Sequence, residues 1–306
     1  MTTLAYYFSS YLDLMGTVAL LSVFFFGLEA LAPAEQRQPL RKRFFNLAYY
    51  PVILVPMLAL NSVIGPVYSR LLQITTGGFL PRVLSAPRSF TGQLLFALLF
   101  AFTWDFWQYW VHRWQHAWPI LWETHKFHHS EIALNSTAQA RHHLSHHLLV
   151  LLLYAPVVLI FGTLSPPVVA SFVMFRVWGF VNHANLRLHL GPLTPIIAGP
   201  QWHRIHHSIN EKHHDKNFAT FFPFIDILFG TYYHPEREEY PATGLGEEKS
   251  VGNLRDATFE PLIGIYRLVT TKPWAFARRT INKKIGPNSR TTLPVHNSSP
   301  YQNDYR

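Results

Sequence analysis

Long apolar stretches separated by short polar loops fill most of the first 181 residues. A helix needs about 20 apolar residues to cross a bilayer. Three stretches reach that length, and two shorter ones, separated by Ser165-Pro166-Pro167, are typical of a helical hairpin. The five stretches are Leu12–Pro33, Phe45–Tyr68, Phe90–Val111, Leu148–Leu164 and Pro166–Val181. The pattern predicts an all-α, multi-span transmembrane helical bundle.

Basic residues in the loops predict how the chain is oriented. Short loops rich in lysine and arginine stay on the cytoplasmic side, and the first stretch is followed by Arg37, Arg41, Lys42 and Arg43. The next two spans then return the chain to the cytoplasmic face near His112. The hairpin returns it there again, so residues 184–306 are expected in the cytoplasm. Loop 69–89 also holds three arginines, which makes the asymmetry modest.

Three regions follow from this threading. Residues 1–90 are expected to form N-terminal transmembrane helices, and residues 91–240 to hold the chemistry, including a membrane hairpin at about 148–181. Residues 241–306 form a basic cytoplasmic tail, whose end (286–306) is rich in Gly, Pro, Asn, Ser and Thr and is expected to be disordered. The basic residues of this tail either contact anionic lipid or are simply solvated.

Composition supports the membrane class. The chain is 49% hydrophobic and 14% charged, whereas soluble domains carry about 25% charged residues. It has no cysteine, which excludes disulfides, cysteine-bound zinc and iron–sulfur clusters. The net charge of +9 is best explained by lipid headgroups. No nucleic acid is expected as a partner, because no DNA- or RNA-binding motif accompanies the charge.

Histidine is the unusual residue of this chain. Of 18 histidines, 16 lie between His112 and His214, and eight of these fall in three boxes. The first box is a His-x-x-x-His pair, whose spacing places both imidazoles on one helix face. The other two boxes share the pattern His-x-x-His-His. The box histidines are His112 and His116; His125, His128 and His129; and His203, His206 and His207.

Eight imidazoles are more than one metal ion needs. A single ion takes about four to six ligands, and imidazole suits iron, zinc, copper and nickel. Boxes that converge at one membrane face therefore predict a dinuclear metal site. Two metal ions can reduce O2 together, and oxidation of an unactivated C–H bond needs such a cofactor because no side chain can do it. A purely interfacial role is less favoured, because burying many imidazoles beside a bilayer without a partner is costly.

The residues around the boxes resemble a known family. The run FTWDFWQYWVHR is followed by LWETHKFHHS, by NHANLRL and by WHRIHHSINEKHHDKNFATFFPFIDILFGT. In order, spacing and flanking residues, about residues 100–234 resemble the fatty acid hydroxylase/sterol desaturase family. The resemblance implies a transmembrane helical domain with a cytoplasmic helical cap, and a di-iron site held by histidines between them.

The resemblance also implies the ligands. The eight box histidines carry over, and His183 matches a further family ligand. Some members have a tenth ligand where this chain has Arg187, and His189 is a weak substitute. His142 either lines the site or contacts headgroups. Of the other histidines, three at the start of a span are expected to be interfacial and two in a polar loop to be exposed to solvent: His143, His146 and His147, and His213 and His214.

Polar residues near the boxes are candidates for outer hydrogen-bond partners, because a ligating imidazole usually donates its second N–H to a carboxylate or amide. Asp105 lies two turns before His112 on the same helix face, and a charge in an apolar span is functional by default. Four further candidates are Glu123, Asn135, Asp215 and Asn217. A plain structural hydrogen bond is an equal alternative for each. Phe172, Phe175 and Trp178 either pack in the core, which is favoured, or wall a pocket for an acyl chain.

The functional hypothesis is a membrane-bound, O2-dependent oxidoreductase that hydroxylates or desaturates a lipid such as a fatty acyl chain or a sterol. Two iron ions are the expected cofactor, with zinc as a substitute in purified protein. A lipid would enter from the bilayer, and a separate reductase with a small electron carrier would supply electrons, since no flavin or NAD fingerprint is present. A bacterial inner membrane and an endoplasmic reticulum fit equally. The alternative is a histidine-rich metal transporter; an intramembrane zinc protease lacks its His-Glu-x-x-His motif.

Overall fold

The computed structural model describes residues 3–36, 38–74, 78–80, 89–162, 165–246 and 251–271. These residues form helices and loops, with no strand among them and two isolated backbone bridges. The chain divides into two units, Met1–Tyr266 and Arg267–Arg306. All candidate site residues belong to the first unit. Arg37 and the segment 286–306, for which disorder is expected, lie outside the described residues.

The predicted all-α class is confirmed. Among the residues that the structure describes, four helices are long and apolar enough to cross a membrane: α1 (Thr3–Leu31), α2 (Leu40–Ile74), α4 (Phe90–Ala117) and α6 (Leu144–Phe161). Large apolar side chains on α1 such as Leu20 and Val23 are 71% and 74% exposed, as expected where lipid takes the place of water. The fifth helix, α7 (Pro166–His183), also forms but is not apolar enough to join these four.

Helix α2 is longer than the apolar stretch that predicts it. It runs for 35 residues through Pro51, Pro56 and Pro66, and it begins in the basic loop at Leu40. Proline inside a helix removes a backbone hydrogen bond, but membrane helices tolerate this where neighbours satisfy the freed groups. The expected bounds of 45–68 are five residues short at the start and six at the end.

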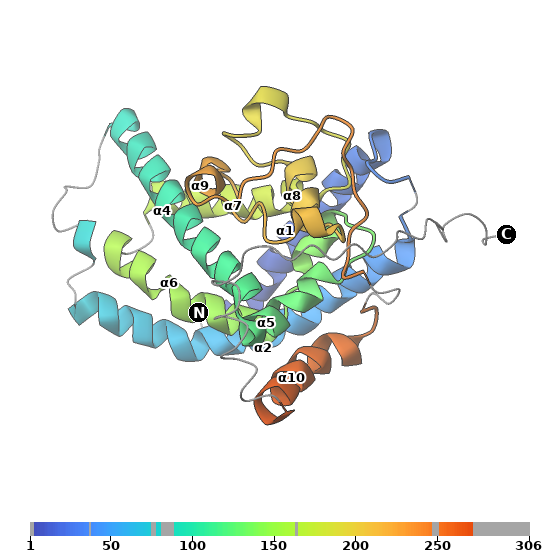
Figure 1. Ribbon diagram of the computed structural model, residues 1–306. Helices are drawn as coiled ribbons and strands as arrows, with labels where there is room; N and C mark the ends of the chain where they lie inside the picture. The colour runs from blue at the N-terminus through green and yellow to red at the C-terminus, as the bar shows by residue number, and fades with distance from the viewer. Residues whose placement is uncertain are drawn as a thin grey trace, which may run out of the picture. The chain divides into compact units, whose positions relative to one another are not determined.

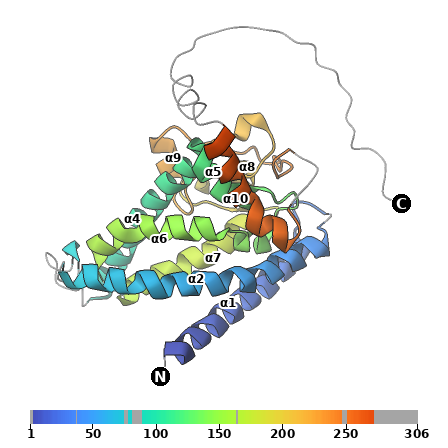
Figure 2. The ribbon, with the colours of Figure 1, turned by 90° about the horizontal axis from the view of Figure 1, so that it is seen from below.

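Helix α4 lies at the centre of the helical packing. It packs against α5 (Pro119–His129), α6 and α7, while α2 packs against α6 (Figures 1 and 2). Aromatic side chains fill the space between α4, α6 and α7, where Phe100, Trp104, Phe161 and Phe175 are buried together. The remaining helices are η1 (Ser136–Ala140), η2 (Gly191–Leu193), α8 (Pro200–His206), η3 (Glu211–His213), α9 (Phe224–Leu228) and α10 (Leu254–Thr271). Figure 2 shows α5, α8 and α9 on the same side of α2, α6 and α7.

A buried polar cluster ties α1 and α2 to the loops that carry histidines. Glu29 on α1 forms an ion pair with Arg43 on α2. Its other oxygen accepts the backbone N–H groups of Ser136 and Asn185, at 2.7 and 2.8 Å. A charge in an apolar helix is costly unless it is paired and hydrogen-bonded, and Glu29 meets both conditions.

Candidate metal centre

The histidine boxes lie at the ends of helices. His112 and His116 occupy the last two turns of α4, and the second box ends α5. His183 is the last residue of α7, and the third box ends α8 with His207 as its cap. Helices α5, α7 and α8 each begin with proline in the first turn, where the missing N–H costs nothing and the fixed φ suits a helix. These helices begin at defined residues, and the imidazoles at their C-terminal ends lie close together.

The nine histidines predicted as ligands come together in two groups. Within each group, one ring nitrogen from every residue lies within 4.8 Å of the others. The first, here called the five-histidine group, contains His112, His116, His125, His129 and His206. The second, the four-histidine group, contains His128, His183, His203 and His207. Helical spacing explains pairs within each group, because His125 and His129, and likewise His203 and His207, are four residues apart and share a face.

Ring nitrogens in these groups point at one another rather than at ordinary donors. The Nε2 atom of His183 lies 3.0 Å from that of His128 and 3.1 Å from that of His203. The Nε2 atoms of His116 and His129 are 3.1 Å apart. Other buried ring nitrogens have no hydrogen-bond partner, among them Nε2 of His112 and of His206 and both nitrogens of His125. A neutral imidazole carries one lone pair for a metal, so this surplus of inward-facing acceptors fits two bound cations.

Burial keeps the box histidines outside the spans neutral. It lowers the pKa of His125, His128 and His129 well below 6.5, and neighbouring histidines lower it further. The same causes lower the pKa of His203, His206 and His207. Metal binding requires the neutral imidazole, so the site presents its ligands in the form that binds. The donor set of nine nitrogens suits iron or zinc.

Backbone carbonyls, not carboxylates, hold the outer nitrogens of three of these rings. His112 Nδ1 lies 2.8 Å from the carbonyl oxygen of Phe218, and His206 Nδ1 lies 2.8 Å from that of Lys216. His183 Nδ1 lies 2.7 Å from the carbonyl oxygen of Gly179, one turn earlier on α7. Each contact fixes the Nδ1–H tautomer and leaves Nε2 free to bind a metal. The sequence motifs do not reveal these partners, because any residue type supplies a carbonyl.

Asp105 has a different partner from the one predicted. Its carboxylate does not bond to His112 but accepts the backbone N–H groups of Thr220, Phe221 and Phe222, at 2.8, 2.9 and 2.6 Å. Asp226 does the same for residues 218 and 219, at 2.8 and 2.9 Å. The two aspartates thereby hold the loop at 216–222 whose carbonyls orient His112 and His206. Asp105 acts on the site through this loop, at one step further from the metal than expected.

The four other residues predicted as outer hydrogen-bond partners of the ligands make contacts of different kinds. Asn135 caps η1 by accepting the N–H of Thr137, and Asn217, at φ 63°, bonds to the backbone of Trp202 and Tyr233. Both interactions are structural. Glu123 faces α10, where its carboxylate would meet a Cβ atom added at Gly264, and it belongs to neither histidine group. Asp215 alone stays near a ligand, with its Oδ1 atom 3.8 Å from His116 Nδ1.

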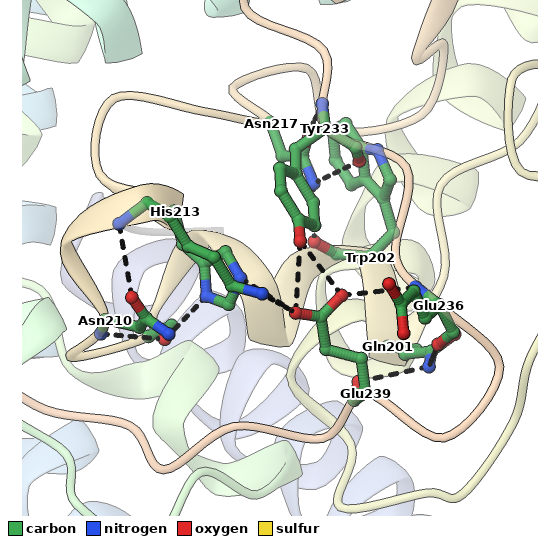
Figure 3. A network of polar contacts seen from close by, with 10 residues as sticks. Gln201, Trp202, Asn210, His213, Asn217, Tyr233, Glu236 and Glu239 are labelled. Atoms are coloured by element: carbon green, nitrogen blue, oxygen red, sulfur yellow. Dashed lines mark hydrogen bonds and ion pairs between the residues drawn. The ribbon is translucent and has the colours of Figure 1, made fainter.

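A polar network anchors α8, which is only seven residues long (Figure 3). Gln201 donates to the carbonyl oxygens of residues 236, 237 and 239. Glu239 accepts from Tyr233 and lies 3.1 Å from His213 Nε2 (Figure 3). Although burial raises the pKa of Glu239, hydrogen bonds from Lys212 and its other neighbours outweigh this effect and lower the pKa to about 2. His213 is buried, so the predicted solvent exposure is wrong for this residue, while it is correct for His214.

Further histidines line a cavity beside the two groups. His142 and His146 lie with His125 in a third set, and both line a cavity of about 320 Å³ together with His147. His143 is buried and lies 3.0 Å from the carbonyl oxygen of Thr258. The interfacial placement predicted for His143 is therefore wrong, while for His146 and His147 it stays a prediction. His142 and His146 are four residues apart, as in the first box, and this spacing is the signal that could have identified them.

His189 does not join either group. Its Nδ1 atom lies 2.8 Å from the amide oxygen of Gln201, so the nine-histidine set has no tenth member at this position. Gln115, which the sequence does not single out, is buried and lies 2.8 Å from His146 Nδ1. Phe172 and Phe175 line the cavity, whereas Trp178 donates to the carbonyl oxygen of Ala198 and packs as expected.

Comparison with known proteins supports the resemblance seen in the sequence. Residues 97–231 match the model of the fatty acid hydroxylase family. Alkylglycerol monooxygenases of Danio rerio and Homo sapiens are 34% and 33% identical over 114 residues, or 37% of this chain. The match covers about a quarter (25%) of the length of each. An ornithine lipid hydroxylase of Rhizobium tropici is 27% identical over 134 residues, which are 44% of this chain and 40% of that protein. No solved structure matches the chain significantly.

The matched segment contains both histidine groups, the loop at 216–222 and the two aspartates that hold this loop. Residues 97–231 therefore match the fatty acid hydroxylase family, and this match includes every residue of the candidate metal centre.

Proposed function

We propose that this protein is a membrane-bound, O2-dependent di-iron oxidoreductase that hydroxylates a C–H bond of a lipid. The observation that carries the proposal is the pair of buried histidine groups, five and four residues strong, whose ring nitrogens face inward. With two iron ions bound by these groups, the site would supply the oxidising power that side chains lack, and insert one oxygen atom of O2 while two electrons and two protons reduce the other to water.

The tasks of the chain itself follow from the contacts. The loop at 216–222 and Gly179 orient three ligand rings through their carbonyl oxygens. The cavity beside the groups would hold the substrate carbon, and its aromatic wall would keep water from the oxidant. Its lining reaches the five-histidine group at His112 and the four-histidine group at His128, so a substrate in it would contact both.

The relatives are an alkylglycerol monooxygenase and an ornithine lipid hydroxylase, and these names favour hydroxylation over desaturation. Both act on lipids with polar headgroups, which supports a similar substrate class here. We further propose that α1, α2 and α4 span the membrane and that α6 and α7 form a membrane hairpin, which returns the chain to the histidine-bearing side. We propose that this side is cytoplasmic and that a separate reductase with a small electron carrier docks there.

Metal content tests the proposal first. The protein should be purified in neutral detergent without a histidine tag or a nickel column, and its metals measured by elemental analysis. About two transition-metal ions per chain are expected, with fewer in the His128→Ala and His206→Ala variants. Two zinc ions would support the same site and would be replaced by iron for assay. One ion or none in the intact protein would contradict the proposal.

The oxygenase step needs its own measurement. Lipids from cells that express the intact protein should gain one oxygen atom, derived from isotopically heavy O2, which lipids from cells with the His128→Ala variant lack. Metal accumulation by cells without any oxidised lipid would instead favour the metal-transporter alternative.

A further inference from the structure

The cavity at the histidine groups carries an unbalanced positive charge. Among the described residues that line it, none is acidic, and Arg176 is the one side chain with a permanent charge. Amide groups of Gln108, Gln115 and Gln139 also line it. An apolar alkyl chain alone has no use for such a lining, because polar groups in a binding pocket fix the orientation of polar substrate atoms.

Arg176 faces the cavity from the same side of α7 as a ligand. Phe172, Phe175, Arg176, Gly179 and His183 all line the cavity, and their spacing of three and four residues puts them on one helix face. Arg176 precedes His183 by seven residues, or two turns, which places their Cα atoms about 10 Å apart along the axis. A ligand that contacts Arg176 would therefore extend toward the four-histidine group.

Arg176 lacks the kind of partner that other arginines of this chain have. Its guanidinium donates to the hydroxyl of Tyr50 at 2.5 Å and lies 6.0 Å from the ring of Tyr50. Arg43, Arg141, Arg187 and Arg204 each form an ion pair with a glutamate, whereas no ion pair among the described residues includes Arg176. A guanidinium offers five N–H donors in a planar fork that matches carboxylate and phosphate. Tyr50 leaves most of these donors for a ligand.

The side chain of Gln139 lies close to the backbone of α7 at Gly179, and both residues line the same cavity. A Cβ atom at Gly179 would lie 2.5 Å from Nε2 of Gln139, so only glycine lets this amide reach the face of α7 between Arg176 and His183. The amide group adds a neutral donor and acceptor next to the charge.

We propose that Arg176, with Gln139 beside it, forms a subsite for the anionic group, phosphate or carboxylate, of a lipid whose chain extends along α7 to the histidines. This inference rests on the proposed function and adds the substrate class, an anionic lipid. It also makes the distance from Arg176 to His183 the element that selects which carbon is oxidised.

Binding of matched lipids tests the subsite without any turnover. Hexadecyl phosphate, palmitate and hexadecanol share a chain and differ in the headgroup. Their affinities for the whole chain in neutral detergent should be measured by quenching of tryptophan fluorescence, since Trp104 lines the cavity. Intact protein should bind the two anions at least about tenfold more tightly than the alcohol, and Arg176→Gln should weaken anion binding about 10- to 100-fold while leaving hexadecanol unchanged. Arg255→Gln, a charge-matched exposed position on α10, should change neither.

Several outcomes would overturn the subsite. An unchanged anion preference in Arg176→Gln, or an equal loss of affinity for all three lipids, would show that Arg176 does not bind the headgroup. Displacement of hexadecyl phosphate by inorganic phosphate at equal concentration would exclude a lipid as the ligand. If Arg176→Gln does not fold, Arg176→Lys keeps the charge and should keep a reduced anion preference; no preference in that variant would also overturn the proposal. Because binding is measured without iron or O2, these results stand whether or not the protein proves to be an oxygenase.

Discussion

The two histidine groups differ in burial and in the number of ligands. The four-histidine group is buried throughout, and its members come from α5, α7 and α8. The five-histidine group includes two slightly more exposed residues of α4, His112 and His116, and the latter lies 3.8 Å from the half-exposed Asp215. The four-histidine group has no ligand to spare, while the five-histidine group has one more than a tetrahedral ion needs. We therefore expect the five-histidine group to exchange its metal faster and to tolerate the loss of one ligand better.

Removal of one ligand from each group should give the largest difference. His203→Ala leaves three ligands in the four-histidine group, so it should weaken metal binding there by at least about 100-fold and abolish lipid oxidation. His116→Ala leaves four ligands in the five-histidine group and should weaken metal binding by about tenfold. Metal content after dialysis against a chelator measures both effects. Equal losses in the two variants would refute the difference in redundancy.

Asp105→Asn should produce the next largest effect, confined to one group. The amide cannot accept three backbone N–H groups as the carboxylate does, so unfolding should become easier by about 2–4 kcal/mol. The loosened loop should weaken metal binding by about tenfold in the five-histidine group, through the carbonyls of Lys216 and Phe218, and leave the other group intact.

Thermal unfolding and metal titration measure these changes together. Glu123→Gln removes a carboxylate charge of α5 that lies against Gly264 of α10 and serves as the matched control, with an expected change within about 0.5 kcal/mol. Loss of metal from both groups in Asp105→Asn would contradict an effect confined to the loop.

Acid should destabilise the metal-free protein. Burial lowers the pKa of His128, His203 and His207 well below 6.5, so below about pH 6.5 the unfolded chain takes up protons that the folded chain does not. The free energy of unfolding should be nearly constant above about pH 7 and fall below about pH 6.5, by about 1.4 kcal/mol per pH unit for each histidine that stays neutral. Unfolding midpoints recorded across this range test the sign; a rise in stability toward acid would refute it.

Asp215→Asn should have the smallest effect. The carboxylate is 51% exposed and 3.8 Å from His116 Nδ1, which is too far for a hydrogen bond, and exposed pairs of this kind contribute little. Metal affinity of the five-histidine group should change by about fivefold or less. A larger change, measured by competition with a chelator, would mean that Asp215 directly orients His116.

The sequence predicts the helices and the eight box histidines because both depend on local spacing, whereas His183 follows from the family resemblance. Apolar length predicts α1, α2, α4 and α6, and helical periodicity explains why box histidines share faces. Asp105 shows where this reasoning ends. The sequence identifies it as a costly charge in an apolar helix, but its partners lie 115 to 117 residues later in the chain. Only the packing of α4 against the loop at 216–222 reveals them.

The division into groups of five and four is also a tertiary property. His206 joins residues of α4 and α5, whereas His203 and His207 join His183 of α7, and no local pattern determines which partner each meets. His213 illustrates the opposite error. Its polar surroundings in sequence predict exposure, yet Glu239 and Ser208 supply its hydrogen bonds and bury it.

The contacts of Glu29 determine when, during synthesis, α1 can reach its native arrangement. Arg43 follows Glu29 by 14 residues, whereas Ser136 and Asn185, whose N–H groups Glu29 also binds, follow Glu29 by 107 and 156 residues. Until both have been synthesised, α1 holds a carboxylate whose hydrogen bonds are incomplete. A nascent chain shorter than residue 185 therefore cannot reach the native arrangement of its first helix. Fragments that end before this point should depend on the insertion machinery, whereas longer ones should become resistant to protease at the α1–α2 loop.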